Sequence, residues 1–159
     1  MARHTFFSFH HKRDVIRAGQ VRNSWVTQER EAAGFWDAAE WESIKKKDTD
    51  AIHAWIDKQM KGTSVTVVLI GKETSTREHV DYEIKQSHAL AKGMLGIYIH
   101  KIKLFDGSID TKGSNPFTKW KFTKSDGTVV TYPTYDWIDD DGRTNIGSWI
   151  ETAAKKAGR

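Results

Sequence analysis

A chain of 159 residues has the length of one domain and is long enough to bury a sizeable core. The absence of cysteine excludes a disulfide framework, a thiolate zinc site and a cysteine nucleophile. The formal charge is +4, but Lys45–Lys47 is followed by Asp48 and Asp50, and this scattering of charge argues against a nucleic-acid binder. No apolar run suits a signal-peptide core or a membrane span, so we expect a cytoplasmic protein.

Strands and helices alternate through the first two thirds of the chain. Hydrophobic periodicity predicts strands over 5–9, 64–70 and 94–99, helices over 14–25, 48–60 and 75–92, and a loop with a short strand over 34–41. Ser75 and Glu78 have the spacing of a capping box, and Gly93 stands where a helix C-cap belongs. Because such alternation builds βαβ units, we expect an α/β fold with a doubly wound, mostly parallel sheet flanked by helices.

Turn signals dominate the last third of the chain. Asp106-Gly107 and Asn115-Pro116 predict a loop over 100–119. A hairpin over 120–123 and 128–132 follows, and then a helix over 146–157 with Asn145 as its N-cap. No repeat or linker divides the chain, so we expect one domain over 1–159, with the hairpin and last helix as a C-terminal extension.

In open parallel sheets, ligands bind beyond the carboxyl ends of the strands. No G-x-G-x-x-G or P-loop motif follows a predicted strand, which argues against a Rossmann or P-loop nucleotide site. His79 and Glu83 have helical spacing and could share a cation with His10 or His11, but a metal site needs more converging ligands, so we predict none. Ser8 beside His10 lacks the G-x-S-x-G elbow of a hydrolase nucleophile.

Residues 64–99 resemble the core of TIR domains, in which an apolar strand, a short loop and a helix with a V-x-x-E-I motif lead to the next strand. Here that motif is Val80–Ile84, which contains Glu83. The whole chain is similar to the TIR-like family that includes the sensor subunit of Thoeris anti-phage systems. The matching segments are FFSFHH at 6–11, VRNSWV at 21–26, FWDAAEWES at 35–43, TSVTVVLIG at 63–71, KGSNPF at 112–117 and NIGSWIETAAKKAGR at 145–159.

The resemblance implies a flavodoxin-like fold and an enzyme of the NAD glycohydrolase or ADP-ribosyl cyclase type. NAD would be its substrate, with no further cofactor and no metal, and Glu83 its catalytic residue. A cyclic ADP-ribose-type signal would activate a separate effector in antiviral defence. A phage-derived trigger and a homo-oligomer are the other partners that the family implies. The chain departs from the pattern at His79, where many TIR enzymes carry Trp.

A carboxylate beside the ribose can stabilise the oxocarbenium character that develops when the nicotinamide bond breaks. By itself, Glu83 is a mid-helix glutamate at the flank of the predicted buried face, a position typical of surface residues. Candidate substrate-binding residues from the matching segments are Phe7, Ser8, His10, Asn23, Trp36, Asp37, Trp41 and Tyr82. The alternative is a non-enzymatic TIR-like interaction or scaffold module that tolerates loss of Glu83.

Overall fold

The structure is a computed structural model, and it describes residues 4–26, 32–33 and 38–159. The strands are β1 (Thr5–Ser8), β2 (Ala32–Ala33), β3 (Val65–Ile70), β4 (Gly93–Tyr98), β5 (Phe122–Thr123), β6 (Val129–Val130) and β7 (Thr134–Asp136). The helices are α1 (Val15–Val26), α2 (Ala38–Lys45), α3 (Thr49–Met60), α4 (Glu78–Ala89) and α5 (Gly142–Lys156), with 3₁₀ turns η1 (Thr74–Thr76) and η2 (Pro116–Lys119).

Five strands form one sheet in the order β2-β1-β3-β4-β7, and every neighbouring pair is parallel. The central pair, β3 and β4, is in register from Val65 opposite Gly93 to Ile70 opposite Tyr98. All of β3 is buried, as expected for a β-branched run that is covered on both faces. The predicted doubly wound parallel sheet is confirmed, and its strand order is that of flavodoxin-like folds.

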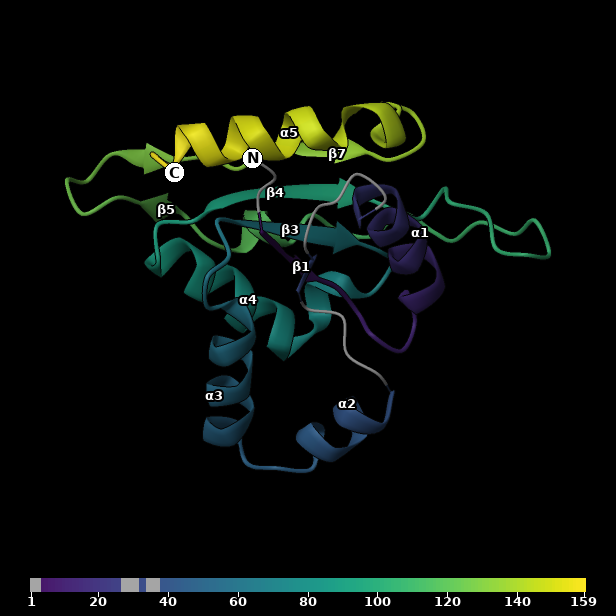
Figure 1. Ribbon diagram of the computed structural model, residues 1–159, viewed down its shortest axis with the longest axis horizontal. Coiled ribbons are helices and arrows are strands. Elements are labelled where there is room, and N and C mark those ends of the chain that lie inside the picture. Colours follow the sequence, from purple (N-terminus) through teal and green to yellow (C-terminus); the bar gives the residue numbers. More distant parts are fainter. Residues whose placement is uncertain (1–3, 27–31, 34–37) are drawn as a thin grey trace.

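Two helical layers cover the sheet, with α5 and α1 on one face and α3 and α4 on the other (Figure 1). Successive side chains of a strand point to opposite faces. Phe7 and Phe9 accordingly pack with the α1 and α5 residues, whereas Phe6 packs with Ile56 and Met60 of α3. Ser8 shares the face of Phe6, and β1 therefore presents its hydroxyl toward the α3 and α4 layer.

The region predicted as a loop with a short strand over 34–41 is different in the structure. The edge strand is Ala32–Ala33, which pairs with β1, and α2 begins at Ala38. Residues 34–37 lie outside the described part of the chain. The short β7 was also missed: Thr134–Asp136 pairs with β4, and its three residues show too little alternation to stand out from the preceding hairpin.

The predicted caps of α4 are wrong at both ends. Arg77 is the N-cap of α4, and its side chain makes no cap bond. Ser75 cannot cap the helix because it belongs to the separate turn η1, which the Thr74 hydroxyl closes by accepting from the Gly71 amide. Gly93 is the first residue of β4 and no cap. A Cβ at Gly93 would lie 2.6 Å from the Ala153 carbonyl oxygen, so glycine allows α5 to approach the strand.

The C-terminal predictions are confirmed in outline. The hairpin forms between β5 and β6, although with fewer paired residues than predicted. The last helix is confirmed but begins at Gly142, with Asp141 as the N-cap; Asn145 lies inside the helix and donates to the Asp140 carbonyl. Within the described residues, no helix has the length and apolar character that crossing a membrane requires.

Candidate active site

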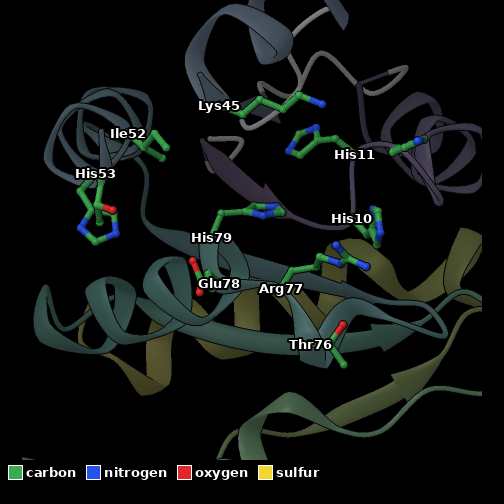
Figure 2. Close-up of a pocket in the computed structure, with 11 residues that line it drawn as sticks. His10, His11, Lys45, Ile52, His53, Thr76, Arg77, Glu78 and His79 are labelled. Atoms are coloured by element: carbon green, nitrogen blue, oxygen red, sulfur yellow. The ribbon is translucent and has the colours of Figure 1, made fainter. Parts of the chain in front are cut away.

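A cavity of about 500 Å³ opens where β1 ends, between α2, α3 and the first turn of α4 (Figure 2). The residues that line it are His10, His11, Lys12, Lys45, Thr49, Ile52, His53, Thr76, Arg77, Glu78 and His79. It lies at the carboxyl edge of the sheet, where ligands of doubly wound folds bind. Figure 2 shows His79 extending from α4 toward His11, with Lys45 across the cavity and His53 on α3.

The cavity walls carry more positive than negative charge. Lys12, Lys45 and Arg77 line it together with one acidic residue, Glu78, among the described residues, while Lys45 pairs with Glu42 and Arg77 with Glu73 beside the cavity. A concave surface of one sign concentrates ligands of the opposite sign. The walls therefore suit a ligand that carries phosphate groups.

Two histidines of the wall, the buried His11 and the half-buried His79, have pKa values below neutral pH. Burial, together with the neighbouring His79 and His10, lowers the pKa of His11 to about 3. Burial likewise lowers the pKa of His79 to about 4, although the bond between its Nε2 and the Phe9 carbonyl acts in the opposite direction. Their ring centroids lie 5.6 Å apart. They add flat, neutral, polar surface to a cavity that takes its charge from lysine and arginine.

Glu83 lies one helical turn beyond His79 on the buried face of α4. Its side chain is fully buried, and its Oε1 accepts a hydrogen bond of 2.7 Å from the Ser8 hydroxyl. Its second oxygen, Oε2, has no hydrogen-bond partner among the described residues. Burial raises the pKa of Glu83 to about 8, while the Ser8 bond and the charge of Lys92 lower it. A buried carboxylate with a raised pKa next to a cavity is a pattern typical of functional sites.

The burial of Glu83 differs from the flank position that the sequence predicted. Val80, Ile84 and Ser87 face the sheet as predicted, but Glu83 joins them there. The cause lies outside the helix, because Ser8 on β1 offers a polar partner in an otherwise apolar layer. A polar group that finds such a partner can be buried at an acceptable cost.

The structure brings some of the sequence-derived candidates together. Ser8 contacts Glu83, and His10 lines the cavity. Tyr82 lies beside the cavity, where its ring stacks on His53 at 3.6 Å and its hydroxyl donates to Asp57. This bond and burial both raise the pKa of Tyr82. Tyr82 thus holds α4 against α3, which forms one wall of the cavity.

Other candidates lie elsewhere. Phe7 packs in the core on the opposite face of the sheet, and Asn23 is exposed on α1. Trp36 and Asp37 lie outside the described residues, and Trp41 belongs to α2 with its side chain outside the described part of the structure.

Sequence reasoning missed the basic residues of the wall. Lys12, Lys45 and Arg77 come from three segments that are far apart in the chain. None belongs to a motif, and each alone is typical of a solvated surface. Only the order of the strands, which sets β1 next to β3, could have indicated that these segments meet.

Comparison with known proteins fits this geometry. The family model described as Thoeris protein ThsB, TIR-like domain, matches residues 6–103, which is more than half of the chain. The chain belongs to this ThsB family of TIR-like domains. A relative from Bacillus cereus (strain MSX-D12), named "Putative cyclic ADP-D-ribose synthase ThsB1", is 34% identical, and the alignment covers 94% of this chain and 100% of that protein. The family resemblance seen in the sequence is confirmed. In this ThsB-type domain, the matched range contains every residue of the cavity wall as well as Ser8 and Glu83.

Within the described residues, no three His, Cys, Asp or Glu side chains are grouped so that they could hold a metal ion. His79 instead bonds to the Phe9 carbonyl, and Glu83 accepts from Ser8. The two residues whose helical spacing raised the question of a shared cation thus have protein partners.

Proposed function

We propose that this ThsB-type domain is an enzyme that cleaves NAD and forms a cyclic ADP-ribose-type signal, which activates a separate effector in antiviral defence. The observation that carries the proposal is a buried carboxylate, Glu83, held by Ser8 one helical turn beyond His79, which lines the cavity at the carboxyl edge of the sheet. The name of the Bacillus cereus relative, which describes a cyclic ADP-D-ribose synthase, supports it.

In this reaction the bond between the ribose carbon and the nicotinamide nitrogen breaks, and its electron pair neutralises the pyridinium ring. Positive charge then develops on the ribose. Glu83, when ionised, stabilises that charge and accepts hydrogen bonds from the ribose hydroxyls, as carboxylates do in glycosidases. Because nicotinamide is a good leaving group in this form, no strong general acid is needed.

Cyclisation requires a nitrogen of the adenine base to form the new bond at the same carbon before water does. The positive charge then passes to the adenine ring, so atoms and charge balance without the loss of a proton. Exclusion of water favours this outcome. The neutral His11 and His79 rings and the stacked pair of His53 and Tyr82 provide flat surfaces for bases next to the cavity. Lys12, Lys45 and Arg77 would hold the diphosphate.

The test is to incubate the purified protein with NAD, with and without extract of phage-infected cells. Nicotinamide release and the mass of the second product are measured. Wild type should release nicotinamide, and Glu83→Gln should lower the rate by at least about 100-fold, a typical loss when a group that stabilises transition-state charge is removed.

Glu151→Gln is the matched control, because Glu151 lies on α5, on the other face of the sheet, and does not line the cavity. Its rate should stay close to wild type. If wild type and Glu83→Gln behave alike under every condition, the enzymatic proposal is wrong, and an interaction module remains as the alternative.

A further inference from the structure

A second charged side chain is buried behind Glu83. Lys92, which follows α4, is only 3% exposed. Its ammonium lies 5.4 Å from the centroid of the Phe6 ring and has no hydrogen-bond partner among the described residues. An isolated ammonium is costly to bury, so an attractive interaction must offset part of the cost. The ring of Phe6 supplies some of it.

Glu83 lies in the same layer, and its charge raises the pKa of Lys92. Phe6 and Ser8 point to the same face of β1, where Phe6 contacts Lys92 and Ser8 contacts Glu83. The free oxygen of Glu83, Oε2, and the Lys92 ammonium are thus two unpartnered groups of opposite charge in one buried layer of the described structure. Charges interact strongly where water is excluded. The attraction favours the ionised form of both, because it lowers the pKa of Glu83 and raises that of Lys92. Burial acts in the opposite direction on each, and with the repulsion from Arg159 it leaves the pKa of Lys92 at about 7.

The rest of the surroundings offers Glu83 little other charge. The strands that α4 covers, β3 and β4, carry no lysine, arginine or acidic residue. The Arg159 side chain donates to the Leu90 carbonyl and repels Lys92. The other titratable side chains on α3, α4 and β4 are Asp50, His53, Asp57, Lys58, Glu78, His79, Asp81, Tyr82, Lys85, His88 and Tyr98. Of all these groups, Lys92 is the one whose charge lowers the pKa of Glu83.

We propose that Lys92 is a positioning residue for the active site: its buried ammonium is a counter-charge that favours the ionised form of Glu83 in the apolar layer. The inference rests on the proposed function, in which the ionised carboxylate faces the ribose. A protonated Glu83 would lose both its attraction for the ribose cation and part of its capacity to accept hydrogen bonds. Lys92 lies outside the walls of the basic cavity, so it would act on the reaction through the charge of Glu83.

The direct test is a titration of Glu83 in the full chain, followed by the ¹³C signal of its carboxyl carbon. The signal is assigned from its absence in Glu83→Gln. In Lys92→Met the pKa of Glu83 should rise by about one pH unit or more, and Lys92→Arg should restore a pKa close to that of wild type. Lys61→Met is the control, because Lys61 is an exposed lysine close to Lys92. An unchanged Glu83 titration in Lys92→Met overturns the proposal.

Activity provides the second readout. If NAD is cleaved, the acid limb of the kcat profile should move to higher pH in Lys92→Met. A rise of the Glu83 pKa by one pH unit corresponds to a loss of about tenfold in rate at pH 7. KM should change little. A loss of activity that is equal at all pH values would indicate a merely structural role and would contradict the proposal.

The two proposals fail in distinguishable ways. If wild type never cleaves NAD, the proposed function is wrong, while the titration still decides whether Lys92 controls the charge of Glu83. If Lys92→Met does not fold, the reciprocal measurement replaces it: the pKa of Lys92, followed by the ¹⁵N signal of its ammonium, should fall in Glu83→Gln. An unchanged pKa of Lys92 in Glu83→Gln would equally contradict the proposed interaction between Lys92 and Glu83.

Discussion

The hydroxyl of Ser8 is the protein group that holds the Glu83 carboxylate by a hydrogen bond. A hydrogen bond to the charged form of an acid favours that form, and here it acts against burial. Residue 8 is the last of β1, so its side chain direction is set by the pleat of the strand. The charge of Glu83 therefore depends on Ser8, whose orientation is set by the strand β1 and not by a catalytic motif.

Removal of this hydroxyl should raise the pKa of Glu83 further. We expect Ser8→Ala to lower kcat for NAD cleavage about tenfold at pH 7, the loss that corresponds to a hydrogen bond with a charged group. Rates are measured from about pH 6 to 9, and the difference should shrink at high pH, where Glu83 ionises in both proteins. Ser75→Ala, in the turn before α4, is the control. An equal effect of both substitutions would contradict the role of Ser8.

His11 should make the fold sensitive to acid. Its pKa is about 3 in the folded protein and near 6.5 in the unfolded chain. Below pH 6.5 the unfolded chain therefore binds a proton that the folded protein does not, and stability falls as the pH falls toward 3. His11→Gln lacks this loss. As the pH falls from about 6 to 4, the free energy of unfolding of the variant should therefore rise relative to that of wild type by up to about 1.4 kcal/mol per pH unit. Urea unfolding at each pH measures it, and parallel curves would contradict it.

At the level of elements, the close approach of α5 to β4 depends on glycine. A Cβ at Gly93 would meet the backbone of Ala153 and Ala154, which cannot rotate away as a side chain could. α5 contributes Ile146 and Ile150 to the main core cluster, so a displaced helix would loosen that cluster. The last helix thus belongs to the same packed layer as α1.

We expect Gly93→Ala to lower the free energy of unfolding by about 1–3 kcal/mol, as overpacking does elsewhere. Gly19→Ala is the matched control, because Gly19 lies within α1 and a Cβ there would meet nothing within 4 Å. It should stabilise the protein by up to about 1 kcal/mol, since alanine is the better helix former. Thermal unfolding of both variants gives the comparison, and the same sign for both would show that packing against α5 is not the cause.

At the level of the whole molecule, three separate segments build one basic wall. Lys12 follows β1, Lys45 ends α2 and Arg77 precedes α4. The parallel order of β1 and β3 brings these segments to the same edge of the sheet. The cavity is therefore a property of the topology and depends on no local motif.

The combined substitution of Lys12→Gln and Lys45→Gln should weaken NAD binding at low salt several-fold and reduce its salt dependence, because exposed charges are screened by ions. Calorimetry of NAD binding between about 20 and 500 mM NaCl measures both effects, with Glu83→Gln as the background to prevent turnover. Lys155→Gln, at the far end of α5, is the control for net charge. A salt dependence as steep as that of wild type would exclude these lysines from the site.

The sequence by itself determined the fold class and pointed to the candidate acid of the site. The run from Val65 to Ile70 can only be a strand buried on both faces, and its alternation with helices requires a parallel sheet. The resemblance around Val80–Ile84 singled out Glu83. These signals are local, so they can be read along the chain.

The tertiary structure decided what depends on contacts between distant residues. Ser8 and Glu83 are 75 positions apart, and only their meeting makes a buried carboxylate tolerable. The same holds for the helix caps. Along the chain Gly93 resembles a helix C-cap, but the reason for glycine there is the close approach of the Ala153 backbone, which is distant in the sequence. Periodicity predicted Glu83 at the flank of the buried face of α4. Its packing against the sheet places it within that buried face.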